Sequence, residues 1–297
     1  MHMAAFADLG MADWHYQRLP VPPELFAETA RALPQLGFRG ANVTIPHKEA
    51  ALALAASASP AARQIGAANT LIFDAEGEIA AENTDAPGLL AAIRHAFPGA
   101  GPAAQHVLLL GAGGSARAAL WALRGAGAAH ISVWARRPER ALALTRELGG
   151  DPVSRPVPAD LLVNCTPVGL ARTDAPLESC NDPLNQAAKP AHEPTSPRLE
   201  HSSSDIAALN QLGLTLDQLR EYSYVVDLVY RSGGTPLLRA ARSLGLHALG
   251  GGEILVRQGA ASFELWTGRR PSLEVMRAAI ADPGADEERP GGPALDG

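Results

Sequence analysis

Short apolar runs alternate with longer stretches of helical periodicity over most of the chain. The Ala-rich stretches 115–127 and 138–148 repeat apolar residues at the spacing of one helix face, and each is flanked by apolar runs. Runs of four or five apolar residues predict buried strands. Strands that alternate with helices predict βαβ units and a parallel sheet. The predicted strands are Ala41–Ile45, His106–Leu110, Ile131–Trp134, Leu161–Asn164 and Val225–Val229.

The chain of 297 residues is long enough for two domains, each with its own core. The Gly- and Pro-rich segment 98–104 predicts a linker between them. We therefore expect two α/β domains with a cleft between them. Residues 1–97 form the first, with a helical segment 254–280 packing back on it, and residues 104–250 form the second.

Two segments lack apolar periodicity. Residues 171–205 are rich in Pro and polar side chains, and residues 281–297 are rich in Gly, Pro and acidic residues. Neither composition buries enough apolar surface to offset the entropy lost on ordering. We expect a flexible insertion in the second domain over 171–205 and a disordered tail over 281–297.

Composition excludes several classes of protein. Hydrophobic residues make up 46% of the chain, but no run approaches the ~18–20 apolar residues of a membrane span, and the N-terminus does not resemble a signal peptide. A net charge of −6 argues against a nucleic-acid partner. Cys165 and Cys180 predict neither a metal site nor a disulfide framework. We expect a cytoplasmic protein without a resident metal.

A glycine-rich turn follows the predicted strand 106–110 and precedes a predicted helix. Its residues, Gly111-Ala112-Gly113-Gly114-Ser115, allow a tight turn and bring backbone N–H groups close to a pyrophosphate at the helix N-terminus. Because strand, turn and helix occur in the required order, this motif predicts a dinucleotide site in a Rossmann domain over 104–250.

The end of the next strand distinguishes the two nicotinamide cofactors. An NAD site usually places Asp or Glu here to bind the ribose 2′-hydroxyl. This chain has Arg136 and Arg137 instead, with Arg140 one turn later. Guanidinium groups suit a 2′-phosphate, so the pattern predicts NADP.

Three polar motifs in the first domain are candidates for chemistry: Asn42-Val43-Thr44-Ile45-Pro46-His47-Lys48, Ala68-Asn69-Thr70 and Asn83-Thr84-Asp85. Each also has a structural explanation. Asp85 can cap the predicted helix 86–96, Asn69 can form a turn, and Lys48 can be a surface cation.

In this order and spacing, the three motifs and the glycine-rich turn resemble the shikimate dehydrogenase family. The resemblance covers residues 2 to about 280, apart from the insertion. It continues through the motifs Asn164–Gly169, Asp227–Tyr230, Thr235–Leu238 and Gln258–Phe263.

The resemblance implies NADP-dependent, reversible reduction of 3-dehydroshikimate to shikimate, a step of chorismate and aromatic amino acid biosynthesis. Lys48 and Asp85 would be the catalytic pair, since loss of a hydride from the carbinol requires a group that takes the hydroxyl proton. The implied substrate contacts are Thr44, Asn69, Tyr230 and Gln258. The implied cofactor contacts are Gly111, Ala112, Gly113, Gly114, Ser115, Arg136, Arg137, Arg140, Thr166, Pro167, Gly251 and Ile254.

The sequence departs from the family pattern in two further places besides the long insertion. The family begins with a strand and a Ser-x-Ser-Pro segment, whereas this sequence starts inside the helix that follows them, so we expect weakened substrate binding. Glu253 and Ile254 stand where the family commonly has Gly and Met. Alternatives therefore stay open: a paralogue acting on quinate or an aminated analogue, or an NADP-binding protein without turnover. Both monomer and homodimer fit the sequence.

Overall fold

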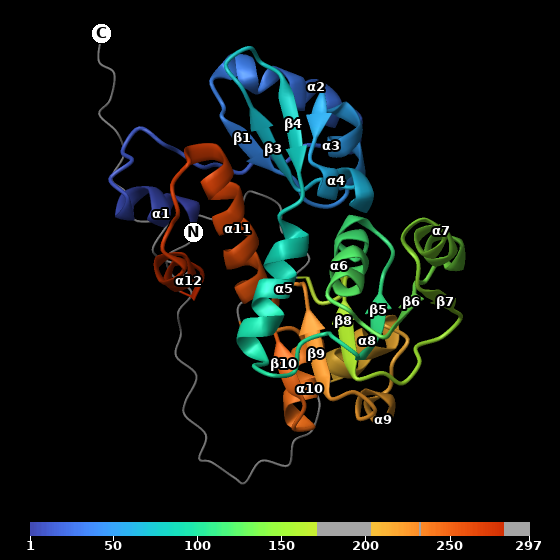
Figure 1. Ribbon diagram of the computed structural model, residues 1–297. Coiled ribbons are helices and arrows are strands. Elements are labelled where there is room, and N and C mark those ends of the chain that lie inside the picture. The colour runs from blue at the N-terminus through green and yellow to red at the C-terminus, as the bar shows by residue number, and fades with distance from the viewer. Residues whose placement is uncertain (171–202, 232, 282–297) are drawn as a thin grey trace.

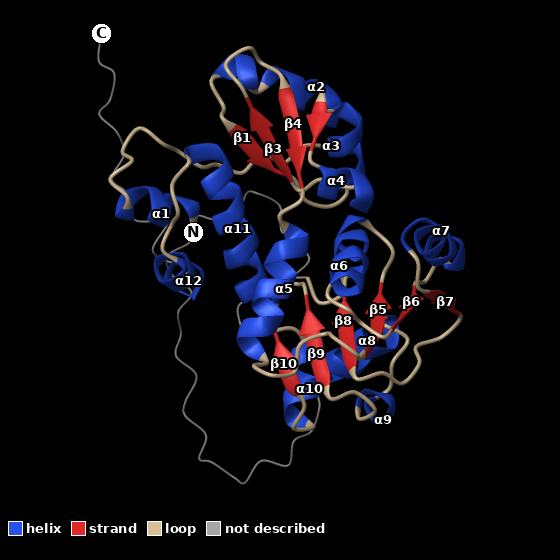
Figure 2. Ribbon diagram, in the orientation of Figure 1, coloured by secondary structure: helices blue, strands red, loops and turns tan. Residues whose placement is uncertain are grey.

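The computed structural model describes residues 1–170, 203–231 and 233–281 as two sheets joined by long helices (Figures 1 and 2). The predicted tail from residue 282 onward, and most of the predicted insertion, lie outside these ranges. Within them, no helix combines the length and apolar character needed to cross a bilayer.

The first sheet has the order β1-β3-β4-β2, with helices packed on it (Figure 1). It is mixed rather than parallel, which corrects the expectation drawn from strand alternation. The reason is a tight turn in which Asp74 Oδ1 accepts hydrogen bonds from the Glu76 and Glu78 backbone N–H groups, so β3 and β4 pair antiparallel. The elements are α1 (His2–Asp8), η1 (Pro23–Leu25), α2 (Phe26–Ala32), η2 (Pro34–Leu36), β1 (Gly40–Asn42), α3 (Lys48–Leu54), β2 (Ser57–Ala58), α4 (Pro60–Ile65), β3 (Thr70–Phe73) and β4 (Ile79–Glu82).

Two long helices run side by side between the sheets: α5 (Asp85–Ala96) and α11 (Gly251–Thr267) (Figure 1). The helix α12 (Leu273–Ala281) follows α11 and packs against α1. Phe6 of α1, Val256 and Phe263 of α11 and Met276 of α12 share one apolar cluster. The C-terminal helices therefore return to the N-terminal region, and they begin at Gly251 rather than at residue 254.

The second sheet has the order β10-β9-β8-β5-β6-β7, and all its strand pairs are parallel. Apolar side chains cover both faces, with Leu109 and Val163 in one cluster and Leu108 and Leu162 in the other. This order and double cover confirm the doubly wound prediction. The elements are β5 (His106–Leu110), α6 (Gly114–Gly125), β6 (His130–Trp134), α7 (Pro138–Leu148), β7 (Asp151–Val153), β8 (Leu161–Asn164), α8 (Ser203–Gln211), α9 (Leu216–Leu219), β9 (Tyr224–Asp227), α10 (Pro236–Ser243) and β10 (His247–Leu249).

The predicted insertion extends too far at its C-terminal end. Helix α8 already begins at Ser203, and Asp205 is buried in an ion pair with Arg239 of α10. The sequence around Ser203 is polar and rich in Pro, so it does not indicate the start of a helix. The contact that buries Asp205 is not apparent from the sequence either, because Arg239 lies 34 residues away.

Candidate functional site

Four of the residues predicted to contact the substrate or act on it meet at one place, although they come from separate elements. Lys48 begins α3, Asn69 immediately precedes β3, Asp85 begins α5, and Gln258 lies in α11. Lys48 Nζ donates to Asp85 Oδ2 at 2.6 Å. Asn69 Nδ2 lies 3.0 Å from Asp85 Oδ1 and 3.1 Å from Gln258 Oε1, so it donates toward both. The result is an ammonium, a carboxylate and two amides in one hydrogen-bonded cluster.

The structural explanations for Lys48 and Asp85 do not hold. Lys48 is only 9% exposed and Asn69 only 2%, so neither is a surface group. The side chain that caps the start of α5 belongs to Asn83, whose Oδ1 accepts from the Ala86 backbone N–H at 3.1 Å. The Asp85 carboxylate is therefore available to Lys48 and Asn69.

Buried hydroxyl groups lie behind this cluster and fix the Asn69 amide. Asn69 Nδ2 is 2.9 Å from Thr84 Oγ1, and Asn69 Oδ1 accepts from the Thr84 backbone N–H at 2.6 Å. Ser262 Oγ lies 3.3 Å from both Thr70 Oγ1 and Thr84 Oγ1, and it donates to the Gln258 carbonyl at 2.9 Å. Thr84 and Ser262 are not among the predicted site residues, although each lies within a motif quoted for the family and contacts the cluster.

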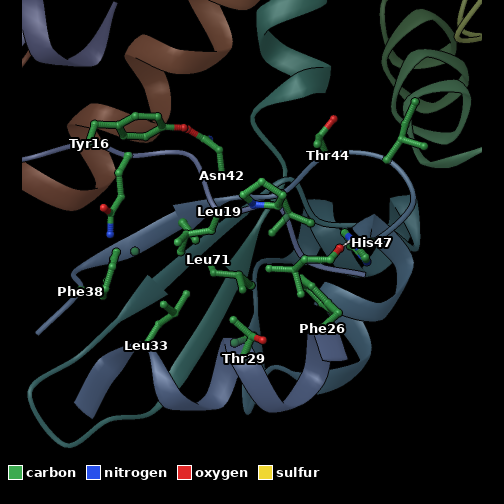
Figure 3. A pocket seen from close by; sticks show the side chains of 18 of the residues that line it. Tyr16, Leu19, Phe26, Thr29, Leu33, Phe38, Asn42, Thr44, His47 and Leu71 are labelled. Carbon is green, nitrogen blue, oxygen red and sulfur yellow. Dashed lines mark hydrogen bonds between the residues drawn. The ribbon is translucent and has the colours of Figure 1, made fainter. Parts of the chain in front are cut away.

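The network continues to Asn42 at the end of β1. Asn42 Nδ2 donates to Ser262 Oγ at 2.8 Å, and the Tyr16 hydroxyl donates to Asn42 Oδ1 at 3.1 Å. Tyr16, Asn42 and Thr44 line a mostly apolar cavity of about 490 Å³. Figure 3 shows these side chains around it. Thr44 is exposed, consistent with a side chain that receives a ligand. Nothing in the sequence linked Tyr16 to the site, because it lies in a segment without a motif.

The Tyr230 hydroxyl is not part of this cluster. It donates to the carbonyl of Ile280 near the end of α12, and the residue is 38% exposed. The backbone beside it is closely packed, since a Cβ at Gly251 would lie 2.6 Å from the Leu228 carbonyl oxygen. Ile254, predicted to approach the nicotinamide, is 5% exposed and packs in the core shared by the second sheet and α5.

The glycine-rich turn has the geometry of a phosphate site. Gly111 has φ of +109°, and a Cβ there would lie 3.2 Å from the Cys165 carbonyl carbon and from Thr166 Cγ2. Gly113 is the N-cap of α6, and a Cβ built on it meets nothing within 4 Å. The N–H groups in the first turn of a helix have no partner within the helix, so the start of α6 offers donors to an anion.

The loop after β8 borders the turn. Thr166 donates through its hydroxyl to Asn164 Oδ1 at 2.7 Å, and the next residue, Pro167, is exposed. Asn164 in turn donates to Asp227 Oδ1 at 2.9 Å, at the end of β9. Burial raises the pKa of Asp227 to about 6, opposed by hydrogen bonds from Thr235, the Val229 N–H and Asn164. These buried contacts hold the loop ends of β8 and β9 together beside the turn.

The arginines lie where β6 ends and α7 begins. Arg136, Arg137 and Arg140 are all exposed, and Arg137 is the N-cap of α7. Since β6 is the neighbour of β5, they stand at the same carboxyl edge of the sheet as the glycine-rich turn. Backbone donors, open space and exposed guanidinium groups thus fit a dinucleotide that carries a 2′-phosphate.

One hydrogen bond joins the polar cluster to the turn. Lys48 Nζ donates to Ser115 Oγ at 2.9 Å, so a residue of the first domain contacts the start of α6 directly. The polar cluster and the glycine-rich turn are therefore in direct contact.

Comparison with known proteins agrees with this geometry. A family model described as the shikimate dehydrogenase substrate binding domain matches residues 1–71, and one described as the shikimate 5'-dehydrogenase C-terminal domain matches residues 251–281. The shikimate dehydrogenase (NADP(+)) of Anaeromyxobacter sp. is 40% identical, over 96% of this chain and 91% of the relative. That of Methylobacterium radiotolerans is 38% identical, over 90% of this chain and 86% of the relative.

A solved structure supports the same assignment. The shikimate 5-dehydrogenase of Thermus thermophilus, in complex with NADP(H) and shikimate, superposes with a TM-score of 0.71 at 35% identity. The match covers 94% of this chain and 91% of that one. Sequence, fold and site geometry lead to one conclusion: the chain belongs to the shikimate dehydrogenase family.

Proposed function

We propose that this protein catalyses the NADP-dependent, reversible reduction of 3-dehydroshikimate to shikimate, a step of chorismate and aromatic amino acid biosynthesis. The observation that carries the proposal is the buried Lys48–Asp85–Asn69 cluster, bonded through Lys48 to Ser115 of a dinucleotide-binding turn. The relatives named for this reaction are 38–40% identical over most of the chain.

Bound NADP⁺ supplies the hydride acceptor for the oxidation of shikimate. As the substrate carbon loses hydride, its hydroxyl loses a proton, and the Lys48–Asp85 pair takes that proton. The ammonium of Lys48 has three hydrogens, of which Asp85 and Ser115 accept two. The third is available to the carbonyl oxygen of 3-dehydroshikimate in the reduction, whereas in the oxidation of shikimate the pair starts without this proton and takes it from the hydroxyl. In the reverse reaction the pair returns the proton to the carbonyl oxygen as hydride arrives at carbon.

The other polar groups orient the substrate. Asn69 and Gln258 lie beside Asp85, and Thr44 is exposed within the same motif as Lys48. These three side chains contact the hydroxyl or carboxylate groups of the substrate. Tyr230 is the fourth proposed contact. Because its hydroxyl is bonded to the Ile280 carbonyl, it must leave α12 to reach the substrate.

The proposed cofactor site follows the carboxyl edge of the second sheet. Backbone N–H groups of Gly111–Ser115 would hold the pyrophosphate, and Arg136, Arg137 and Arg140 would hold the 2′-phosphate. Thr166 and Pro167 would lie along the cofactor, and Gly251 and Ile254 would border the nicotinamide. Residues 1–97 with 254–280 then form the substrate domain, residues 104–250 form the cofactor domain, and the cleft between them is the reaction site.

The test is reduction of NADP by shikimate and by quinate, measured side by side, with NAD as the cofactor control. We expect turnover with shikimate and NADP and much lower rates when either is replaced. Preference for quinate or an aminated analogue would assign a paralogue, and NADP binding without turnover would assign a non-enzyme. We also propose that the protein works in the cytoplasm as a monomer or homodimer, on a small-molecule substrate and without nucleic acid. Light scattering measures the oligomeric state, and cell fractionation measures the localisation.

A further inference from the structure

We infer that Ser115 is a positioning residue for Lys48, so that the turn which binds the cofactor also sets the geometry of the proton-transferring ammonium. The inference rests on the proposed function, because it takes Lys48 to be part of the catalytic pair. It assigns a second task to a residue whose backbone N–H belongs to the cofactor site.

The contact joins residues that the sequence does not associate. Lys48 and Ser115 are 67 positions apart, one at the start of α3 beside the first sheet and the other in the first turn of α6 beside the second. The Nζ–Oγ distance is 2.9 Å, while Nζ is 2.6 Å from Asp85 Oδ2. A lysine head on a flexible four-carbon stem needs more than one acceptor to hold a single position.

The stem of Lys48 is held by the same turn. A Cβ at Gly114 would lie 2.8 Å from Lys48 Cβ and 3.1 Å from Lys48 Cδ. The aliphatic part of the lysine therefore lies directly on the backbone of Gly114, and the next residue, Ser115, accepts a hydrogen bond from its head. Two consecutive residues of the cofactor turn thus fix both ends of the Lys48 side chain.

A neutral acceptor suits this position. Asp85 already provides one carboxylate to the ammonium, and a hydroxyl takes a second hydrogen without adding charge. Alanine at 115 would leave Lys48 free to rotate about the Asp85 contact, and the third hydrogen would lose its fixed direction. Since a small misplacement of a catalytic group reduces rate steeply, we expect this loss to lower turnover.

The competing explanation is that the Ser115 hydroxyl serves only the cofactor, by donating to a phosphate. The two explanations predict different losses. If the hydroxyl positions Lys48, its removal lowers kcat and leaves NADP affinity unchanged, because the backbone N–H remains. If it binds phosphate, NADP affinity falls instead.

A matched control lies two residues further along the same helix. Arg117 Nε donates to the Ile65 carbonyl at 2.6 Å, so it too joins α6 to the first domain. It also forms an ion pair with Glu147 of α7, in the second domain. Arg117→Ala therefore removes an inter-domain contact of α6 while the bonds from Lys48 to Asp85 and Ser115 stay in place.

The kinetic experiment compares Ser115→Ala, Ser115→Thr and Arg117→Ala in shikimate-driven NADP reduction, with NADP dissociation constants measured by titration. We expect Ser115→Ala to lower kcat about 10- to 100-fold, with the NADP Kd within about twofold of the parent. This is less than the about 10²–10⁴-fold contribution of an acid–base group itself, because the ammonium is still present. Ser115→Thr, which keeps the hydroxyl, should recover most of the rate, and Arg117→Ala should change kcat less than about threefold. Unchanged kcat in Ser115→Ala, or a loss confined to NADP affinity, overturns the inference.

A spectroscopic measurement keeps the test independent of the substrate assignment. Lys48 and Lys189 are the lysines of this chain, so lysine labelled with ¹³C at Cε gives a spectrum in which Lys48→Arg identifies the Lys48 signal. We expect that signal to move in Ser115→Ala, to return in Ser115→Thr and to stay in place in Arg117→Ala. A Lys48 signal unaffected by Ser115→Ala contradicts the inference even when shikimate is the wrong substrate, whereas failure of the parent to oxidise shikimate contradicts only the proposed function.

Discussion

The polar side chains around Lys48 are buried and bonded to one another, whereas the arginines at the end of β6 stand in solvent. Asn69 is 2% exposed and holds Asp85 and the backbone of Thr84, while Arg136 and Arg137 are exposed. Both sets are proposed to meet a polar ligand. They differ in how much of their geometry is fixed before the ligand arrives.

The difference follows from the two tasks. Proton transfer requires a group held within a few tenths of an ångström, and buried hydrogen bonds provide that at low reorganisation cost. Recognition of a 2′-phosphate requires charge and planar donors, which an exposed arginine can bring to the ligand after binding. The substrate side should therefore respond to substitution in rate and stability, and the cofactor side in affinity.

The largest expected effect is that of Lys48→Ala. Loss of the proton-transferring group should lower kcat by about 10²–10⁴-fold. NADP affinity should stay nearly the same, because the lysine contacts the turn through Ser115 Oγ and not through the backbone donors. Steady-state kinetics with an NADP titration measure both; a loss below about tenfold would remove Lys48 from the chemistry.

The Arg136→Ala, Arg137→Ala double variant should weaken NADP selectively. A hydrogen bond to a charged group contributes roughly 1.5–3 kcal/mol, so the NADP Kd should rise at least about tenfold while the NAD Kd barely changes. Both side chains are exposed, so the melting temperature should not move. Unchanged NADP affinity would mean that the phosphate lies elsewhere.

The pH dependence of the free energy of unfolding tests how strongly burial affects a polar side chain of the first domain, His2. Burial lowers the pKa of His2 to about 4 from the ordinary 6.5, although its hydrogen bond with the Gly259 carbonyl opposes the shift. Between pH 6.5 and about pH 4, His2 is protonated in the unfolded chain but neutral in the folded chain. The free energy of unfolding therefore falls as the pH falls through this range. The loss amounts to about 3 kcal/mol.

His2→Phe should remove this dependence while keeping a ring against Tyr16, which stacks on His2 at 4.2 Å between centroids. Asp227, with its raised pKa of about 6, acts in the opposite direction over part of this range, so the difference between parent and variant is the quantity to measure. Urea titrations at several pH values give it. Parallel curves for the two proteins would show that His2 has the same pKa in the folded and the unfolded chain, so that its burial does not disfavour protonation.

The smallest expected effect belongs to Ser262→Ala. Its hydroxyl accepts from Asn42 and donates to the Gln258 carbonyl, and its loss leaves a partly buried amide without this acceptor. We expect a stability loss of roughly 1–3 kcal/mol and a modest fall in kcat. Thr267→Ala, on the same helix with a similar bond to the Phe263 carbonyl, is the control and should cost less. Equal losses would argue against a connected network.

The sequence predicts features that depend on neighbouring residues, and it does not predict contacts between residues far apart in the chain. The strands His106–Leu110 and Leu161–Asn164 and the helix over 138–148 agree with the structure residue for residue, because each is one uninterrupted pattern. Lys48, Asn69 and Asp85 could be singled out because each lies in a short motif. Tyr16 could not, because it lies in no motif. The link that Ser262 makes to Asn42 could not either, because that contact spans 220 positions.

The most direct test asks whether the free-energy losses caused by substitutions at Lys48 and at the two arginines are additive. We would measure kcat/KM for NADP at saturating shikimate. The variants are Lys48→Ala, the double variant Arg136→Ala, Arg137→Ala, and the triple variant that combines them. If the substrate side supplies chemistry and the cofactor side supplies affinity independently, the free-energy losses of the first two should sum to that of the third within about 0.5 kcal/mol. A triple variant no worse than Lys48→Ala alone would contradict the account, because it would show that the arginines and the lysine act on one and the same step.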